Sequence, residues 1–302
     1  MIDDLLDLIA AHGDRGAVVP ISRVDDLRQD MEALRVGDYH TEVLDRRVSF
    51  IDRFIPADLP FEPKSVIVVV TPSPKMAIEF SIGGRPFQAI LPPSYADMGP
   101  ADAKVLAYIR EHLTPLGHFA EEAEWLPLKP LATHCGLALY GRNNIGINDE
   151  FGSYMRILAY FSDIECGDTF WRPLGRLPQC ETCHACVECC PTGAIDPVRN
   201  IIDADICLTW INEKPDDFPD WLSPDAHNCL VGCLKCQDCC PLNAENRKHA
   251  TLGGSFSQDE TTELLAHVQG DPYSKALQAK IDGIGISRYA QVLPRNLAAL
   301  LR

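Results

Sequence analysis

The chain has 302 residues, 46% of them apolar and 23% charged, and its formal net charge is −16. This composition is typical of a globular protein with a sizeable core, and no apolar run approaches the ~20 residues of a membrane span. The acidic charge, without a Lys/Arg run longer than two residues, argues against nucleic acid as a partner. The first residues are acidic, so we expect no secretory signal and a cytoplasmic protein whose thiols stay reduced.

The N-terminal part shows clear helix and strand patterns. Apolar residues three and four apart predict helices over 2–11 and 24–34. The β-branched run 64–71 predicts a central buried strand. Two strands, 77–82 and 86–91, flank a Gly-Gly pair that is typical of a hairpin turn.

Further along the chain, helices are predicted over 100–113 and 128–136, where Gly136 ends the second one. A turn with a strand follows over 138–147, and another strand over 154–161. A loop is predicted at 251–257, and then a small helical bundle made of 264–268, 274–281 and 288–301. The predicted domains are 1–175, 176–250 and 251–302.

Cysteine is the most unusual feature of the composition. The chain has thirteen, and eleven of them lie between residues 180 and 240. An odd number of cysteines in a large chain with no secretory signal does not indicate a disulfide framework. Metal binding is the better explanation of this density.

Two segments repeat the cysteine spacing of bacterial ferredoxins. The first runs C-x2-C-x2-C-x3-C-P from Cys180 to Pro191, and the second runs C-x2-C-x3-C-P from Cys233 to Pro241. In this arrangement, the cysteine before proline binds the cluster of the other motif. We therefore predict two [4Fe-4S] clusters, the first bound by Cys180, Cys183, Cys186 and Cys240, and the second by Cys190, Cys207, Cys233 and Cys236.

Several cysteines allow alternatives. Cys207 is the predicted fourth ligand of the second cluster, and Cys229 is its rival. Cys189 and Cys239 are expected to face the core as small apolar groups, or one of them replaces its neighbour as a ligand. A four-cysteine zinc site is the alternative for any single C-x2-C pair. The two remaining cysteines, at 135 and 166, are expected to be structural, or else one is a reactive thiol.

Three sequence blocks resemble the epoxyqueuosine reductases, which are iron–sulfur enzymes related to the reductive dehalogenases. They are the two cysteine motifs with the segment 207–213 between them, the block 131–143 ending in Gly-Arg-Asn, and Gly152-Ser153-Tyr154. The resemblance covers roughly 60–250. It implies an α+β fold in which a nitroreductase-like sheet domain precedes a ferredoxin-like double-cluster module and a short helical tail.

The resemblance also implies a base-off cobalamin that the nearer cluster reduces. The residues expected close to it are Gly141, Arg142, Asn143, Gly152, Ser153 and Tyr154. Glycine-rich turns at strand ends let backbone N–H groups approach a ligand, although ordinary loop-forming turns would show the same pattern.

Proton donors are harder to identify. The family's Asp-Ser-Ala-Pro segment is replaced here by 121–125, so Glu122 and Glu124 are the candidate acids, or exposed carboxylates. Tyr95 is another candidate donor, with packing as its alternative role. His134 is expected to be a partly buried, hydrogen-bonded histidine, or else a ligand or proton donor. Lys235 and Arg199 would offset the cluster charge.

The sequence therefore predicts an oxidoreductase in which two clusters pass low-potential electrons to a cobalamin that reduces a small substrate. The first alternative is a partner that reduces another protein, such as a corrinoid protein. The second is tRNA epoxyqueuosine reduction, although tRNA is not expected as a partner, because of the charge, the replaced aspartate segment and a short C-terminal tail. The electron donor would be a ferredoxin or a flavodoxin.

Overall fold

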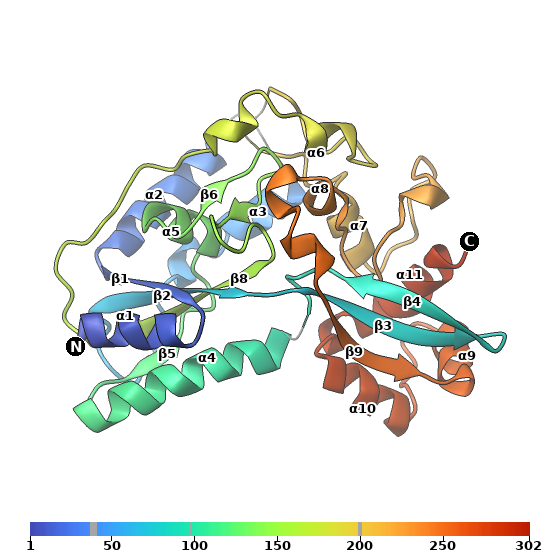
Figure 1. Ribbon diagram of the computed structural model, residues 1–302, viewed down its shortest axis with the longest axis horizontal. Coiled ribbons are helices and arrows are strands. Elements are labelled where there is room, and N and C mark those ends of the chain that lie inside the picture. Colours follow the sequence, from blue (N-terminus) through green and yellow to red (C-terminus); the bar gives the residue numbers. More distant parts are fainter. Residues whose placement is uncertain (37–40, 97, 199–200) are drawn as a thin grey trace. The chain divides into compact units, whose positions relative to one another are not determined.

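The computed structural model describes residues 1–36, 41–96, 98–198 and 201–302 (Figure 1). The chain forms two compact units. Unit 1 comprises Met1–Pro72 and Ala101–Cys183, and unit 2 comprises Ser73–Pro100 and His184–Arg302. This division differs from the predicted boundaries, because residues 73–100 and the C-terminal tail both group with most of the cysteine-rich segment.

Unit 1 is built on a four-stranded antiparallel sheet with the order β1-β2-β8-β5. The strands are β1 (Arg15–Pro20), β2 (Ser65–Pro72), β5 (Ala120–Glu122) and β8 (Met155–Ser162). β2 lies inside the sheet, and residues 66–70 are fully buried, so the predicted central strand is confirmed. β1 was not predicted.

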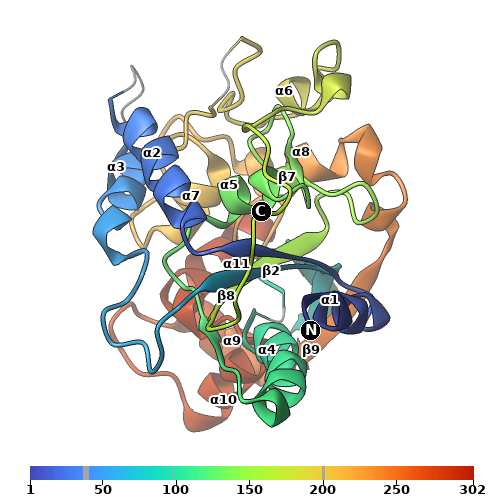
Figure 2. The same cartoon turned by 90° about the vertical axis from the view of Figure 1, so that its left-hand side faces the viewer.

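Helices cover both faces of this sheet (Figure 2). Because side chains alternate along a strand, Ile67 and Val69 pack with one set of helices and Val66 and Val68 with the other. The first set is α1 (Ile2–Ala11) and α4 (Met98–Leu113), and the second is α2 (Arg23–Arg35), α3 (Glu42–Val48) and α5 (Leu128–His134). The helices predicted in this part of the chain are confirmed.

A small hairpin of β6 (Leu139–Tyr140) and β7 (Gly146–Ile147) follows α5. Gly136 lies just after the end of α5 with φ 85°, as expected of a helix-terminating glycine. Three short 3-10 helices complete unit 1, namely η1 (Ile51–Arg53), η2 (Thr114–Leu116) and η3 (Pro178–Cys180).

Unit 2 contains a three-stranded sheet with the order β4-β3-β9. β3 (Lys75–Ile82) and β4 (Arg85–Leu91) form the predicted hairpin, while β9 (Ala250–Phe256) pairs with β3 in parallel. The prediction of a loop at 251–257 is therefore wrong. The strand is hard to recognise because its partner lies far away in sequence and because two glycines, Gly253 and Gly254, lower its strand propensity. A Cβ on Gly253 would meet the side chain of Met76, which would have to shift to make room for it.

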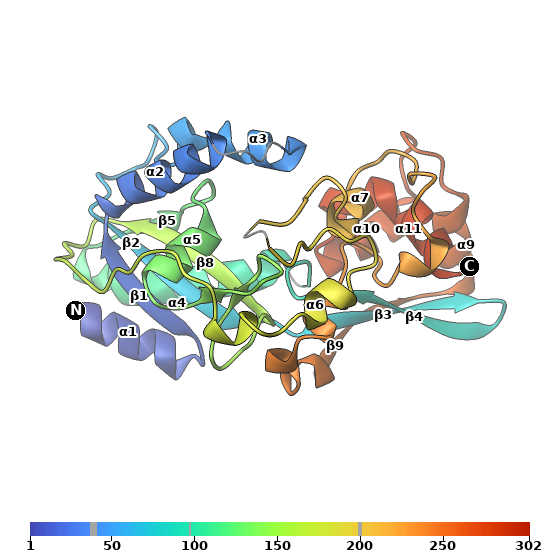
Figure 3. The same cartoon turned by 90° about the horizontal axis from the view of Figure 1, so that it is seen from above.

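The C-terminal tail packs on this sheet as a helical layer (Figure 3). It contains α9 (Gln258–Ala266), α10 (Lys275–Ile284), η7 (Ser287–Val292) and α11 (Leu293–Leu300), so the predicted helical tail is confirmed. A capping box between Ser257 and Glu260 starts α9. Phe80 of the sheet and Leu264 and Ile281 of the helices belong to one buried cluster.

The rest of unit 2 is the cysteine-rich part, in which the elements are short. They are α6 (Ala185–Glu188), α7 (Leu208–Glu213), η4 (Pro224–Ala226), α8 (Lys235–Asp238), η5 (Pro241–Asn243) and η6 (Asn246–Lys248). The structure thus confirms a mixed fold of helices and sheets. Within the described ranges, no helix has both the length and the apolar character needed to cross a bilayer.

Candidate iron–sulfur centre

The four cysteines predicted to bind the second cluster all belong to unit 2. Cys190 follows the end of α6, and Cys207 is the N-cap residue of α7. Cys233 lies just before α8, and Cys236 lies within it. Short helices that begin or end at a cysteine hold several thiols at fixed positions with little backbone, which suits a cluster that binds four sulfurs.

The electrostatics of the thiols show that three of these cysteines are neighbours. Burial raises the pKa of Cys233, and the nearby Cys207 and Cys190 raise it further. Burial likewise raises the pKa of Cys207, with a contribution from Cys190. Thiols packed together without a cation resist ionisation, whereas bound iron would favour the thiolate form. Cys190, Cys207 and Cys233 therefore form one group with the right donor chemistry for a cluster.

Among the residues that the structure describes, no three His, Cys, Asp or Glu side chains converge as the ligands of a single metal ion do. The prediction of cubanes in place of zinc comes from the spacing of the two motifs, because a cubane takes its four thiolates at the ferredoxin intervals.

Asn228 is a residue that the sequence analysis missed. Its Nδ2 lies 3.3 Å from the sulfur of Cys233 and donates to it, and its Oδ1 accepts from the backbone N–H of Leu234 at 2.9 Å. The side chain therefore connects a predicted ligand to the start of α8. Hydrogen bonds to cluster sulfurs tune a centre, but no spacing rule marks an asparagine five residues before a cysteine motif.

Cys229, the rival of Cys207, is buried, with 1% of its surface exposed. Its thiol donates to Oδ1 of Asn228 at 3.2 Å. Burial raises the pKa of Cys229 well above its ordinary value, and Cys233 contributes to the rise. Cys229 thus lies beside the predicted ligand Cys233, and the choice of Cys207 as the fourth ligand stays a prediction.

The cysteines predicted to bind the first cluster are divided between the units, with Cys180 and Cys183 in unit 1 and Cys186 and Cys240 in unit 2. In unit 1, the guanidinium of Arg142 donates to the carbonyl oxygens of Cys180, Glu181 (3.3 Å) and Cys183 (3.1 Å). Arg142 is itself buried. The arginine that the resemblance placed beside the corrin thus holds the loop that carries the first two cysteines.

The hairpin that carries Arg142 also fixes the segment before this loop. The backbone of Tyr140 accepts from Leu177 N–H at 2.9 Å and donates to Gly175 O at 3.1 Å. Arg172, earlier in the same segment, donates to Thr133 O and Ala138 O at 2.9 and 2.6 Å. These hydrogen bonds to unit 1 therefore fix the position of the extended segment that leads to Cys180 and Cys183.

Cys189 and Cys239, the two cysteines next to proline-flanked ligands, form a disulfide in unit 2. The expectation that both face the core was wrong, since both are only partly buried. The other eleven cysteines are free, so this one pair does not make a disulfide framework. The pattern of each motif alone cannot reveal the pairing, because it depends on the packing of α6 against α8.

The remaining predicted cofactor residues lie in two turns of unit 1. Gly141 begins a turn that is closed by hydrogen bonds of its backbone N–H and C=O to other residues of the turn. A Cβ on Gly141 would lie 2.6 Å from Oδ1 of Asn143. Gly152 has φ 59° and pairs with Asn148, while Ser153 and Tyr154 are buried. The internal packing of the turns accounts for both glycines, and these contacts by themselves do not indicate a corrin.

Tyr95 lies in the core of unit 2 and is 6% exposed. Its hydroxyl donates to Glu213, and its ring packs against Gly232 and the edge of Tyr289. Burial, and then Glu213, raise the pKa of Tyr95 well above its ordinary value. The contacts of this residue therefore agree with the packing alternative, and its catalytic role stays a prediction.

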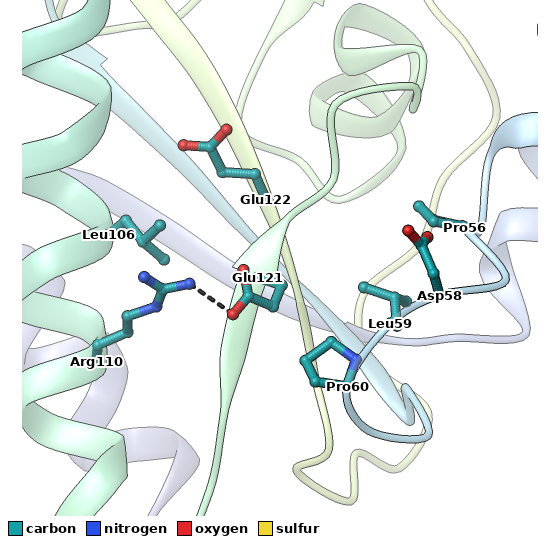
Figure 4. A pocket seen from close by; sticks show the side chains of 8 residues that line it. All are labelled: Pro56, Asp58, Leu59, Pro60, Leu106, Arg110, Glu121 and Glu122. Atoms are coloured by element: carbon teal, nitrogen blue, oxygen red, sulfur yellow. Dashed lines mark ion pairs between the residues drawn. The ribbon is translucent and has the colours of Figure 1, made fainter.

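Glu122 and Glu124 are both exposed. Glu122 lines a pocket of about 430 Å³ in unit 1 (Figure 4), together with Asp58, Arg110 and Glu121. Arg110 forms an ion pair of 2.7 Å with Glu121, so it offsets the charge of one of the three carboxylates that line this pocket. Glu124 does not line it. Their role as proton donors also stays a prediction.

His134 and Cys135 of unit 1 are both buried. His134 is 5% exposed, and its two ring nitrogens lie 2.6 Å from Arg172 O and from a carboxylate oxygen of Asp30. Burial lowers the pKa of His134, but the hydrogen bonds to Asp30 and to the backbone outweigh it, so the net pKa is raised. Cys135 is buried, which raises its pKa to about 12. Arg199 lies outside the described residues, and Lys235 begins α8.

Comparison with known proteins supports the metal centre. Residues 179–243 match the family described as "4Fe-4S double cluster binding domain". An epoxyqueuosine reductase from Leadbetterella byssophila is 34% identical over 40% of this chain and 38% of its own length. One from Gloeobacter violaceus is 32% identical over 57% of this chain and 54% of its own length. The chain therefore spans about half or less of these curated relatives.

Solved structures of epoxyqueuosine reductases are similar to this chain in fold. Epoxyqueuosine reductase from Bacillus subtilis superposes with a TM-score of 0.66, covering 99% of this chain and 80% of that one, at 18% identity. An epoxyqueuosine reductase in complex with an epoxyqueuosine-modified tRNA stem loop gives the same TM-score and identity. The chain thus carries a double [4Fe-4S] cluster domain and is a relative of the epoxyqueuosine reductases in sequence and in fold.

Proposed function

We propose that the chain is a reductase of the epoxyqueuosine reductase type, in which two [4Fe-4S] clusters supply electrons to a modified nucleoside of tRNA. One observation carries this proposal, namely the two ferredoxin-type cysteine motifs, Cys180–Pro191 and Cys233–Pro241, which lie within the segment 179–243 that matches the double-cluster domain. Clusters of this type, when bound, pass single electrons at low potential. Removal of an epoxide oxygen as water consumes two electrons and two protons, so a donor with two one-electron centres suits it.

The ligands that we propose are those that the motifs predict. Cys180, Cys183, Cys186 and Cys240 would bind one cluster, and Cys190, Cys207, Cys233 and Cys236 the other. Arg142 would keep the first pair of thiols in place through their backbone carbonyls. Asn228 would donate to a sulfur of the second cluster. The cysteines, Arg142 and Asn228 would have these roles whether the clusters are oxidised or reduced.

The proposal that tRNA is the substrate contradicts our expectation from the net charge of the chain. The net charge of −16 led us to expect another substrate, but a total charge does not describe a local surface. The curated relatives are named epoxyqueuosine reductase, and one similar structure holds an epoxyqueuosine-modified tRNA stem loop. These findings support tRNA more strongly than the composition opposes it.

A second candidate is the reduction of a small molecule through cobalamin. It is favoured by the replacement of the family's aspartate segment with residues 121–125, where the structure has exposed carboxylates. Cobalamin is proposed from the resemblance alone, and no step here depends on it. We also infer a nitroreductase-like fold for unit 1, supported by its sheet with helices on both faces.

The test is a conversion assay under argon. The reconstituted chain is mixed with a low-potential reductant and tRNA carrying epoxyqueuosine, with and without added cobalamin, and the nucleosides are analysed by mass spectrometry. Loss of one oxygen from the nucleoside supports the proposal, and a Cys233→Ser variant should abolish it. A chain that contains both clusters and leaves the nucleoside unchanged in both arms would exclude tRNA and leave the small-molecule candidate.

A further inference from the structure

We propose that Cys189 and Cys239 form a redox-active disulfide, which stores two electrons beside the clusters and is reduced by them. This inference rests on the proposed function for its source of electrons. The disulfide itself is a feature of unit 2 that neither cysteine motif requires.

The position of the pair places it next to ligands of both clusters. Cys189 is the residue after α6 and precedes Cys190, while Cys239 is the residue after α8 and precedes Cys240. In the crossed ligation proposed above, Cys190 and Cys240 bind different clusters. Each sulfur of the disulfide is therefore one peptide bond away from a ligand residue of one cluster, and the S–S bond joins the two sides.

The environment of the sulfurs suits the reduced state as well as the oxidised one. The sulfur of Cys189 lies 3.3 Å from Lys235 O, and the sulfur of Cys239 lies 3.3 Å from Ala185 O. As thiols, both would have a backbone acceptor ready, since a sulfur donor reaches somewhat farther than an N–H or O–H donor. Lys235 and Ala185 are the first residues of α8 and α6. The two bonds would therefore cross between the helices and keep them together when the disulfide opens.

Burial separates this pair from Cys135 and Cys229. Cys189 and Cys239 are partly buried, as the predicted cluster ligands are, whereas Cys135 and Cys229 are buried, which leaves them inert as single thiols. A partly exposed disulfide is more readily reduced than a fully buried one.

The step balances as follows. The disulfide accepts two electrons and two protons, the S–S bond breaks, and two thiols form. Each electron comes from one reduced [4Fe-4S] cluster, which returns to its oxidised state, and the protons come from solvent. Reoxidation reverses the step and returns two electrons to the clusters. The pair thus links one-electron donors to a two-electron reaction.

The test is a reductive titration combined with differential alkylation. The chain is purified and reconstituted under argon, freed of small thiols, and photoreduced with deazaflavin in known increments. Wild type should accept about four electrons per chain, two in the clusters and two in the disulfide. The double variant Cys189→Ser/Cys239→Ser should accept half as many. Cys166→Ser, which removes a cysteine outside both motifs, serves as the matched control and should behave as wild type.

Alkylation before and after reduction then identifies the residues by mass spectrometry and does not depend on the variants. Cys189 and Cys239 should be labelled only after photoreduction, and they should stay unlabelled when the irons have first been removed with a chelator. Iron content and the visible spectrum of the clusters report separately on the proposed function. Intact clusters that accept two electrons while the labelling of Cys189 and Cys239 does not change would overturn the inference.

Discussion

Unit 1 and the cysteine-rich part of unit 2 are stabilised in different ways. In unit 1, β2 is covered on both faces, and Val66–Val70 are fully buried. In the cysteine-rich part, α6 has no buried residue, and only Gln237 of α8 is buried. Burial of apolar surface therefore accounts for the first region. In the second it holds α7 through Leu208 and Ile211, whereas α6 and α8 bury no apolar side chain and depend on thiol chemistry, that is, clusters and a disulfide.

Because of this difference, we expect substitutions to fall into two groups according to their effect on stability and on metal content. Those in the sheet of unit 1 should lower the free energy of unfolding and leave the metal content unchanged. Those among the cysteines should remove iron and loosen the region around residues 184–245, while the sheet persists. Four predictions follow the comparison, in order of decreasing effect.

The largest effect is expected for the ligands of the second cluster. Cys207→Ser and Cys233→Ser should each lower the iron content from about eight to about four atoms per chain, because a cubane that lacks a ligand is unstable. The freed segment should also become sensitive to protease, since metal binding and folding are coupled. Iron analysis and limited proteolysis provide the measurement.

The matched control for this pair is Cys229→Ala. Cys229 is fully buried beside Asn228 and is not expected to bind iron. A variant at 229 that loses four irons, together with a variant at 207 that keeps eight, would assign the fourth ligand to Cys229 instead.

A smaller effect, limited to unit 1, is expected for Val68→Ala. Val68 is fully buried between β2 and the second set of helices. The loss of its methyl groups and the resulting cavity should lower the free energy of unfolding by about 2–3 kcal/mol. Urea unfolding measures this, and the exposed Leu116→Ala is the control. Loss of iron in Val68→Ala at low urea would show that the two regions are not independent.

The third prediction concerns the hydrogen bonds by which Arg142 of unit 1 holds the loop that carries Cys180 and Cys183. Arg142→Ala leaves three carbonyl acceptors of residues 180–183 without their donor. These acceptors belong to partly buried or exposed residues, so each lost hydrogen bond costs about 0.5–1.5 kcal/mol, and one cluster should be lost to a chelator several-fold faster. Arg142→Lys keeps the charge but not the planar fork of donors, and it should give an intermediate rate. Equal rates in all three proteins would remove Arg142 from this role.

The smallest effect depends on pH. Because the folded pKa of His134 is raised, its bond to Asp30 adds stability that is fully present below the unfolded pKa of about 6.5 and is lost as pH rises through the folded pKa. The stability difference between wild type and Asp30→Asn should therefore be greatest near pH 5.5 and shrink toward pH 8.5. Thermal unfolding across this range provides the measurement, and a difference that grows with pH would contradict the assignment.

Local patterns were sufficient for much of the fold. The β-branched run at 66–70, the Gly-Gly hairpin and the helical tail all carry their signal within a few residues, and the structure confirms each of them. The strand β9 was missed because its stability comes from parallel pairing with β3, about 175 residues away. Non-local pairing leaves no periodicity in the sequence of the strand itself.

The candidate site shows the same limit. The spacing of the motifs identified the cysteines, because a cubane demands thiolates at fixed intervals. It could not identify Asn228, the role of Arg142 or the disulfide of Cys189 and Cys239, since these depend on which elements pack together. The clusters are thus predictable from the sequence, whereas the residues that position and connect them are not.

The account depends most directly on the metal inventory of the intact chain. Iron and acid-labile sulfide, measured after anaerobic reconstitution and combined with Mössbauer spectra, should give about eight of each per chain and the signature of [4Fe-4S] centres. Zinc in place of iron, or a single cluster in a fully reconstituted chain, would contradict it.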